Sequence, residues 1–233
     1  MFFPERIRSV GPNDTVLEIG PGGTPHSRAD VFLEKRFDDP TIAEGQRGSA
    51  TPLQTTKEIV FYDGGLFPFH DKQFDYVICS QVLEHVEDID AFVAEIVRVG
   101  KRGYLEYPTI YYDYMYNFPE HITFIFRRNN ILYWMPKAEA ELDRFLCIQG
   151  FFYESLRKGY TAMVDELRSF LFQGFEWDGG IVSQRAFSLE QVSYTPDELQ
   201  FPTPPKEDSQ RKVEGGFLAA VGGLFCRIRK GSR

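Results

Sequence analysis

Five apolar stretches bounded by polar or glycine-containing turns dominate the first half of the chain. They fall at residues 16–19, 29–34, 58–63, 74–80 and 102–108. Each is four to seven residues long, short enough for a strand, and is made up largely of apolar side chains. These features predict strands buried in a sheet, which is typical of a parallel sheet covered on both faces.

One segment between these strands has the period of an amphipathic helix. Residues 88–99 place Phe92, Ile96 and Val99 on one face. Asp88 is suited to cap the amino end, and Gly100 to end the helix. Together with the strands, this helix predicts an α/β fold: a Rossmann-like three-layer sandwich with a mostly parallel sheet and one antiparallel late strand.

The first predicted strand, Val-Leu-Glu-Ile, runs directly into the turn Gly20-Pro21-Gly22-Gly23. Glycines allow positive φ and let the backbone approach a ligand closely. In doubly wound folds such a turn, at the carboxyl end of the first strand, binds nucleotide-like cofactors. A dinucleotide fingerprint needs a third glycine at position 25, where this chain has Pro25. The sequence therefore argues against a nicotinamide or flavin dinucleotide.

Several ordered motifs resemble the class I S-adenosylmethionine-dependent methyltransferases, of the methyltransferase type 11-like kind. Glu18, Gly20 and Gly22 match the family's acidic strand and G-x-G turn. Farther along, Phe-Pro-Phe at 67–69, Phe-Asp-Tyr-Val at 74–77 and Leu-Glu-His-Val at 83–86 fall in the family's order. The resemblance implies a methyltransferase that uses S-adenosylmethionine (SAM) as its cofactor.

The resemblance also implies which residues contact SAM. Glu34, ending the second strand, would bind the ribose diol, and Asp63, ending the third, the adenine amino group, unless each is a solvated strand-end carboxylate. Ser80 and Gln81 would lie under the methionyl end. Glu18 would order the glycine turn or meet the ammonium group. The full expected set is Glu18, Gly20, Pro21, Gly22, Gly23, Glu34, Asp63, Gly64, Ser80 and Gln81.

The chain departs from the family between the first two strands. Only residues 24–28 separate Gly23 from the second strand, and five residues cannot form three helical turns. Either the first helix is short or missing, or the second strand is misplaced. His26 or Arg28 would then supply positive charge near the cofactor, or lie on the surface. Residues 36–57 are polar and rich in glycine and serine, and we expect a flexible loop, such as a lid.

Histidine is the simplest general base for a methyl acceptor, and His85 and His121 are the two histidines expected near the cavity mouth. Each is also compatible with a purely structural role. The three cysteines, Cys79, Cys147 and Cys226, are far apart and lack metal-ligand spacing. We therefore expect no metal site, and the cysteine usage fits a reducing cytoplasm.

The expected domain is residues 1–192, with a substrate-side insertion at 109–172. Aromatic residues crowd positions 104–126 and would form a substrate wall or ordinary packing. Helical spacing follows from residue 138 to 172, interrupted by Gly150 and Gly159, and residues 175–177 and 181–182 are candidate late strands completing an antiparallel edge. Residues 193–233 are an extended proline-rich segment followed by an apolar and basic tail.

Charge and hydropathy limit the classes of molecule that the protein is expected to bind. The net charge of −8 argues against a nucleic-acid surface. The start of the chain has no signal-peptide pattern, so we expect a cytoplasmic protein. The apolar tail is too short to span a bilayer; it would dock on the chain itself, stay disordered, or contact a membrane surface peripherally. We therefore expect a methyltransferase for a small-molecule or lipid-linked acceptor, through oxygen or nitrogen. The alternative is a non-catalytic module on the same fold that binds SAM or a partner.

Overall fold

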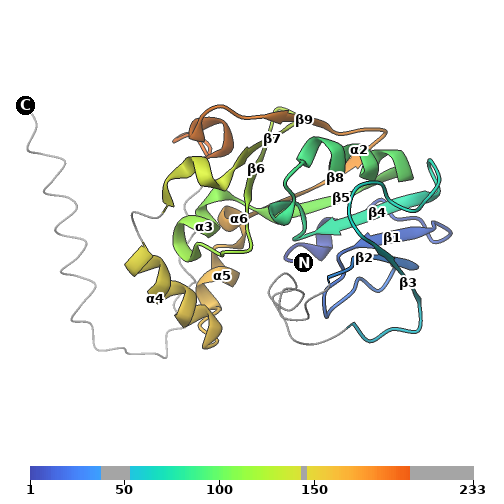
Figure 1. Cartoon of the computed structure of the whole chain (residues 1–233), viewed down its shortest axis with the longest axis horizontal. Helices are drawn as coiled ribbons and strands as arrows, with labels where there is room; N and C mark the ends of the chain where they lie inside the picture. Colours follow the sequence, from blue (N-terminus) through green and yellow to red (C-terminus); the bar gives the residue numbers. More distant parts are fainter. Residues whose placement is uncertain (38–52, 143–145, 200–233) are drawn as a thin grey trace, which may run out of the picture. The chain divides into compact units, whose positions relative to one another are not determined.

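A computed structural model describes residues 1–37, 53–142 and 146–199, which belong to one compact unit. Six strands form its main sheet in the order β3-β2-β1-β4-β5-β8 (Figure 1). Their bounds are β1 (Val16–Ile19), β2 (Val31–Lys35), β3 (Glu58–Tyr62), β4 (Phe74–Ser80), β5 (Gly100–Pro108) and β8 (Phe172–Asp178). The five strands expected from the sequence are all present.

The direction of the strands agrees with the expected fold class. β1 lies between β2 and β4 and is parallel to both, with Glu18 opposite Phe32 and Ile78. β8 runs antiparallel to β5, with Trp177 opposite Gly103. The α/β class, the mostly parallel sheet and the antiparallel late strand are confirmed.

The connection from β1 to β2 contains turns and no helix. The Gly20 amide donates to the Leu33 carbonyl oxygen at 2.9 Å, which holds the glycine turn against β2. The His26 amide donates to Glu18 Oε2 at 2.8 Å, and the Arg28 guanidinium donates to the Gly11 carbonyl. The second strand was therefore placed correctly, and the first helix is missing. The expected lid at 36–57 falls largely outside the described residues, which resume at 53.

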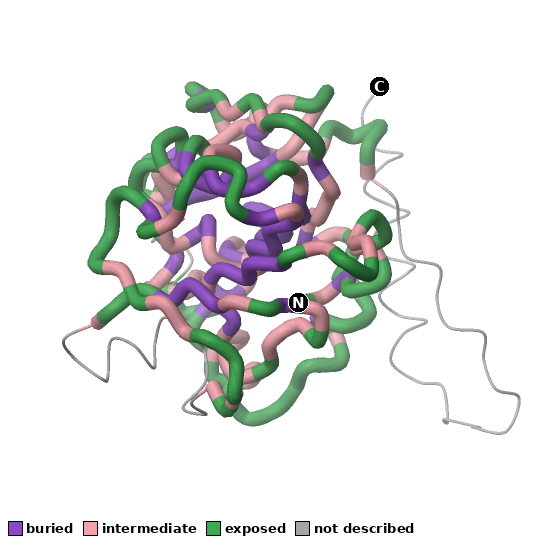
Figure 2. Tube along the Cα trace, turned by 90° about the vertical axis from the view of Figure 1, so that its right-hand side faces the viewer, coloured by how far each residue is buried: buried purple, intermediate pink, exposed green. Residues whose placement is uncertain are grey.

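Helix α2 (Ile89–Val99) covers one face of the sheet (Figure 1). Its apolar stripe, including Val93, Ile96 and Val99, packs on buried side chains of the sheet, Cys79 among them. Asp88 accepts the Ala91 amide at 3.0 Å, so the predicted cap is confirmed. Gly100 follows the helix with extended φ and ψ of −107° and 150° and begins β5. The helix thus leads directly into β5, most of whose residues are buried. Figure 2 shows that buried stretches of the chain lie in the interior and exposed ones around them.

The opposite face of the sheet is covered in part by the amino-terminal segment, which includes the short 3-10 helix η1 (Pro4–Arg6). Ile7 and Val10 pack on a buried cluster of Val16, Tyr76, Ile78 and Tyr104. The Glu176 carboxylate of β8 accepts the Arg8 and Ser9 amides and the Tyr76 hydroxyl. This carboxylate ties the segment to the edge of the sheet.

A second sheet was not expected. It contains β6 (Thr123–Arg128), β7 (Ile131–Pro136) and β9 (Val182–Arg185) in the order β6-β7-β9. Asn129 and Asn130, with φ of 51° and 64°, make the tight turn between β6 and β7. The expectation that residues 181–182 complete the antiparallel edge of the main sheet is wrong. β9 pairs parallel with β7 instead, because the chain crosses from β8 to the other sheet.

The remaining helices lie at the end of the main sheet away from β3 (Figure 1). They are α3 (Ile110–Tyr116), α4 (Leu146–Arg157), α5 (Ala162–Glu166) and α6 (Arg168–Leu171). Three further 3-10 turns occur along the described chain: η2 (Leu83–His85) between β4 and α2, η3 (Lys137–Ala140) after β7, and η5 (Leu189–Val192) after β9. Helical structure within 138–172 is confirmed. Gly150 does not interrupt it, since it lies inside α4, whereas Gly159 has φ of +91° just after α4 ends.

Many of the aromatic residues at 104–126 are packing residues. Phe124 and Phe126 are buried in a cluster with Ile110, and Tyr116 is buried with Phe172. Tyr194 stacks on Tyr111 at 5.6 Å between ring centroids. The boundary expected at 192 remains a prediction, and the apolar and basic tail lies outside the described residues.

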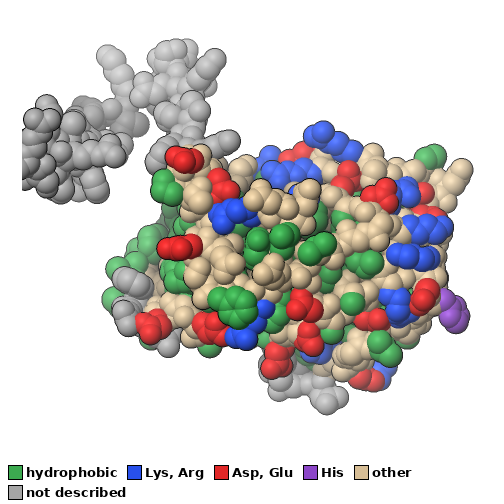
Figure 3. Space-filling view, turned by 90° about the horizontal axis from the view of Figure 1, so that it is seen from above, with side chains coloured by type: hydrophobic (Ala, Val, Ile, Leu, Met, Phe, Trp, Pro, Cys, Tyr) green, Lys and Arg blue, Asp and Glu red, His purple; other side chains and the backbone are tan. Residues whose placement is uncertain are grey.

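Among the described residues, no helix is both long and apolar enough to cross a membrane. On the face over β7 and β9, Lys and Arg side chains are intermingled with Asp and Glu (Figure 3).

Candidate functional site

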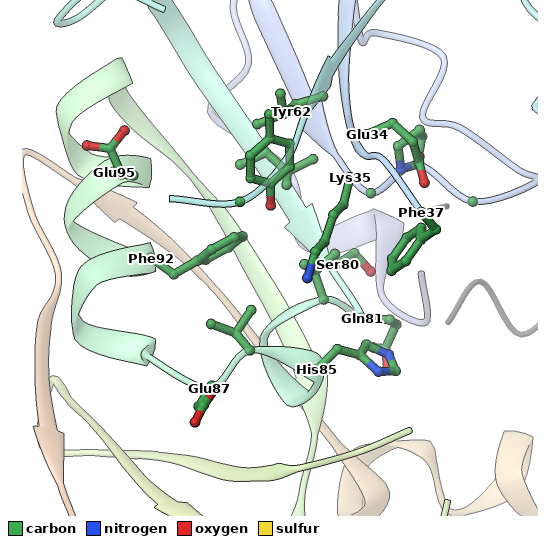
Figure 4. Close-up of a pocket in the computed structure, with 18 of the residues that line it drawn as sticks. Glu34, Lys35, Phe37, Tyr62, Ser80, Gln81, His85, Glu87, Phe92 and Glu95 are labelled. Carbon is green, nitrogen blue, oxygen red and sulfur yellow. The ribbon is translucent and has the colours of Figure 1, made fainter. Parts of the chain in front are cut away.

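A cavity of about 1010 Å³ opens at the carboxyl ends of β1, β2 and β4. Its walls come from the glycine turn after β1, the end of β2, the turn after β3, and the segment that links β4 to α2 (Figure 4). Parallel strands direct their carboxyl ends to the same edge of the sheet, which explains how distant motifs meet here. Gly20, Pro21, Gly22, Gly23, Glu34, Gly64, Ser80, Gln81 and His85 all line it.

The glycine turn needs its glycines for two different reasons. Gly20 and Gly22 have φ of +61° and +58°, in the left-handed region that side chains with a Cβ rarely adopt. A Cβ on Gly20 would also lie 2.6 Å from Val82 Cγ2, whereas a Cβ on Gly22 would meet nothing within 4 Å. Gly20 thus allows the first turn to approach the segment after β4, and Gly22 leaves open space beside the cavity.

Glu18 is buried behind the turn and does not line the cavity. Its carboxylate accepts the His26 amide, so it orders the connection to β2, one of the two roles expected for it. Burial raises its pKa to about 7, although the His26 amide and the charge of Lys57 oppose the rise.

The two strand-end carboxylates have different surroundings. Glu34 is buried and lines the cavity, as do its neighbours Lys35 and Phe37. In Figure 4 the Lys35 side chain extends into the cavity between Phe37 and Tyr62. Asp63 does not line the cavity: its side chain is 77% exposed and pairs with Arg36 at 3.3 Å. Gly64, which follows it with φ of +105°, does line the cavity.

Ser80 and Gln81 are held by a carboxylate that the sequence analysis missed. Glu106 Oε1 accepts Ser80 Oγ at 2.9 Å and Gln81 Nε2 at 3.2 Å. The Gln81 amide also donates to the Glu106 carbonyl at 2.9 Å, which supports the unusual φ of +58° at Gln81. The missed signal was a single acid within the apolar strand Tyr-Leu-Glu-Tyr, because a buried carboxylate needs donors around it.

Glu106 also fixes the start of the chain. Its two oxygens accept the amides of Phe2 and Phe3 at 2.7 and 2.9 Å, and the Tyr104 hydroxyl at 2.8 Å. Met1, which precedes Phe2, lines the cavity. One buried carboxylate therefore joins the amino terminus to Ser80, the last residue of β4, and to Gln81, which follows it.

The two candidate histidines play different parts. His85 is partly buried and lines the cavity, with Nδ1 2.9 Å from the Glu120 carbonyl oxygen. His121 is buried and does not line it; its Nδ1 lies 2.8 Å from Asp113 Oδ2. Burial, together with nearby His121, lowers the pKa of His85 to about 4. Burial also acts to lower the pKa of His121, but the Asp113 carboxylate outweighs it and raises that pKa.

Comparison with known proteins bears on this site. Residues 33–105 match the family model described as a methyltransferase domain. The glycine turn, residues 20–23, precedes the matched segment. The match therefore rests on the residues of β2 to β5 and α2 and does not include Glu18 or the turn. The matched segment includes the cavity-lining residues Glu34, Gln81 and His85.

Parts of the chain are also similar to known proteins in sequence and in structure. A ubiquinone biosynthesis O-methyltransferase of Rickettsia bellii is 33% identical over 78 residues, 33% of this chain and 31% of that protein. The chain thus spans about a third of the length of the curated relatives it matches. A SAM-dependent methyltransferase of Thermotoga maritima is 20% identical, with 46% and 49% of the chains covered and a TM-score of 0.31. Another, of Methanosarcina mazei, is 19% identical, with 52% and 69% covered and a TM-score of 0.31.

Proposed function

We propose that the protein is a SAM-dependent methyltransferase that transfers a methyl group to a hydroxyl oxygen of a small or lipid-linked acceptor. The observation that supports this best is the continuity of one cavity, from the glycine turn at Gly20 to His85 and Ile122. Its volume of about 1010 Å³ lies at the upper end of the usual range for ligand pockets, roughly 300–1,000 Å³. Such a cavity has room for a cofactor and an acceptor side by side.

The lining residues fit SAM. At Gly22 a Cβ would meet nothing within 4 Å, so the backbone of the turn has open space beside it in which a ligand can approach. Glu34 places a carboxylate at the end of β2, where it can accept bonds from a ribose diol. Ser80 and Gln81, oriented by Glu106, lie at the end of β4 beneath the expected methionyl group. Tyr62, Phe92 and Leu66 supply apolar surface for an adenine ring.

Bound SAM supplies a methyl group already activated by a positively charged sulfur. The protein therefore needs mainly to align an acceptor with the methyl carbon and to exclude water. Val82, Val86 and Ile122 provide apolar walls near His85 for the second task. His85 directs one ring nitrogen to the Glu120 carbonyl, which leaves Nε2 to take up a hydroxyl proton.

The choice of oxygen as acceptor atom draws on two observations. The Rickettsia relative is named an O-methyltransferase, and His85 is the cavity-lining imidazole at the end of the cavity opposite Glu34 (Figure 4). A hydroxyl must lose its proton on methylation, so a nearby acceptor for that proton is useful. The chemical class of the acceptor is proposed as phenolic, because the walls there are apolar.

The first experiment is a calorimetric titration of the purified full chain with SAM and with S-adenosylhomocysteine. Methyl transfer from radiolabelled SAM to a panel of simple phenols and catechols follows. We expect micromolar SAM binding and transfer to at least one catechol. His85→Asn should lower kcat at least tenfold with little change in SAM affinity. His70→Asn, which replaces an exposed histidine, is the matched control.

The outcomes separate the proposal from its alternative. SAM binding without transfer to any acceptor would favour a binding module on the methyltransferase fold. No binding at millimolar SAM would show that the absence of the first helix has disabled the cofactor site. The amino terminus of such a helix would add positive charge near the carboxylate of the methionyl group of SAM.

A further inference from the structure

A cluster of three metal-binding side chain types, two of them buried and one partly buried, lies at the end of the cavity where the acceptor is proposed to bind. It contains Glu84, His85 and His121, whose ligand atoms all lie within 4.8 Å of one another. Glu84 and His85 come from η2, and His121 follows α3, so residues 36 positions apart in the chain meet here. The His85 and His121 rings are edge to face, 5.1 Å apart between centroids.

We propose that Glu84, His85 and His121 bind one divalent transition-metal ion, with an open coordination position toward the cavity. Two imidazoles and one carboxylate suit Zn²⁺ and the neighbouring first-row ions, and three protein ligands leave room for an exchangeable fourth. Ion binding follows from the cluster itself. Only the role of the ion in methyl transfer, given below, rests on the proposed function.

The first support is an orphaned oxygen. Glu84 is 1% exposed, and its Oε2 atom has no hydrogen-bond partner. Its other oxygen, Oε1, lies 3.9 Å from His85 Nε2, too far for a good hydrogen bond. A buried carboxylate oxygen without a donor is costly unless a proton or a cation meets it. A metal ion between Glu84 and the two imidazoles would remove that cost.

The second support is the orientation of the imidazoles. A ligating histidine usually directs its other ring nitrogen to a carboxylate or a carbonyl, which fixes the ring and its tautomer. Both histidines do so: His85 Nδ1 lies 2.9 Å from the Glu120 carbonyl oxygen, and His121 Nδ1 lies 2.8 Å from Asp113 Oδ2. The Nε2 atom of each ring is then the one left to bind a metal.

The charges around the cluster also suit a cation. Asp113 is already paired with Lys137, whose Nζ lies 2.7 Å from Asp113 Oδ1 and also donates to the Phe118 carbonyl. The remaining carboxylate of the cluster, Glu84, has no Lys or Arg within ion-pair distance among the described residues. A divalent ion would supply the missing positive charge.

The position of the cluster beside the cavity gives the ion access to the acceptor and a function in methyl transfer. His85 lines the cavity, so an ion bound to its Nε2 borders the space where an acceptor would lie. A hydroxyl bound to the ion would lose its proton to solvent more readily, since the metal stabilises the oxygen anion. The oxygen pair would then form the bond to the methyl carbon, while the carbon–sulfur pair remains on sulfur. In the metal-bound protein the ion would thus assist loss of the acceptor's hydroxyl proton, the function proposed for His85 when no ion is bound.

The test uses the full chain with any purification tag removed, stripped with a chelator and titrated calorimetrically with ZnCl₂, MnCl₂ and MgCl₂. We expect one Zn²⁺ per chain, bound more tightly than Mg²⁺. Glu84→Gln and His85→Asn should weaken Zn²⁺ binding by roughly 100-fold, and Asp113→Asn by roughly 10- to 100-fold. His70→Asn and Cys147→Ser, at exposed positions, should bind Zn²⁺ as the natural chain does.

Thermal unfolding with and without Zn²⁺ gives a readout that needs no activity. The ion should raise the Tm of the natural chain and leave the Tm of a folded Glu84→Gln variant unchanged. Absence of stoichiometric binding, or equal binding by Glu84→Gln and the natural chain, would overturn the inference. SAM titration of the same samples keeps the two proposals apart, because loss of Zn²⁺ binding with intact SAM binding refutes the metal site alone.

Discussion

Gly20 and Val82 approach each other so closely that the glycine has no room for a side chain. A Cβ on Gly20 would lie 2.6 Å from Val82 Cγ2, and its φ is +61°. This contact joins the turn after β1 to the segment after β4, and both line the same cavity. This contact between distant parts of the chain therefore limits which residues can stand at position 20 and contributes to the geometry of the cavity.

Gly20→Ala should weaken SAM binding much more than Gly22→Ala. Both alanines take a left-handed backbone, which costs about 1–2 kcal/mol, but only the one at position 20 meets Val82. Overpacking adds about 1–3 kcal/mol, so the two SAM dissociation constants should differ by roughly tenfold or more in calorimetry.

The double variant Gly20→Ala/Val82→Ala is the control for this clash. Shortening Val82 should recover most of the affinity lost in Gly20→Ala. If the two single glycine variants bind SAM equally, the contact with Val82 does not shape the site.

Glu34→Gln and Asp63→Asn should have unequal effects on cofactor binding. Glu34 is buried and lines the cavity, whereas the Asp63 side chain is exposed and paired with Arg36. Loss of a charged acceptor for the ribose diol should weaken SAM binding by roughly 10- to 100-fold. Asp63→Asn should change it by less than about threefold. Calorimetric titration of both variants checks this, and the reverse order would restore Asp63 as the adenine contact.

Because of Glu18, the protein should become less stable as the pH rises. Its pKa is about 7 in the folded protein and about 4.5 in the unfolded chain. The folded state therefore holds a proton that the unfolded state has lost, and stability decreases as the pH rises from about 4.5 to 7. A difference of this size corresponds to at most about 3 kcal/mol, at 1.36 kcal/mol per pKa unit.

Urea unfolding of the natural chain and of Glu18→Gln, between pH 5 and 8, measures this contribution. Glutamine can still accept the His26 amide but does not titrate in this range. The natural chain should lose stability relative to Glu18→Gln as the pH rises. Parallel curves for the two proteins would mean that Glu18 is not held in its protonated form.

Glu106→Gln should loosen the amino terminus and the end of β4 together. The carboxylate accepts the Phe2 and Phe3 amides and the Ser80 hydroxyl, and an amide nitrogen cannot accept any of them. We expect a loss of about 2 kcal/mol in unfolding free energy and faster hydrogen exchange at Phe2 and Phe3. Glu190→Gln, at an exposed position, should change neither quantity. Unchanged exchange in Glu106→Gln would mean that Glu106 does not anchor the amino terminus.

The local sequence pattern was enough to predict the strands and the helix that surround the proposed cofactor site. The strands β1 to β5 are short apolar runs. Those of β1, β4 and β5 are buried between α2 and the amino-terminal segment, which requires apolar side chains on both faces. The cap at Asp88 followed from neighbouring residues, since a cap is a local property. The five-residue connection left two alternatives, a short or missing first helix or a misplaced second strand, and the structure decided for the missing helix.

Long-range contacts explain the elements that were missed or misplaced. β9 pairs with β7, some fifty residues earlier, and no period within residues 181–185 specifies that partner. Aromatic residues such as Phe124 and Phe126 fit a buried strand as well as a substrate wall, and only the cluster around Ile110 decides between these interpretations.

The sequence by itself therefore determined the class of fold, the glycine turn and the strand-end positions of Glu34, Ser80 and Gln81, because each depends on residues close in the chain. The tertiary structure alone decided that Glu106 orients Ser80, that Asp63 stays outside the cavity, and that Glu84 and His85 meet His121. Burial and contact between distant segments control these relationships, and neither is encoded in local spacing.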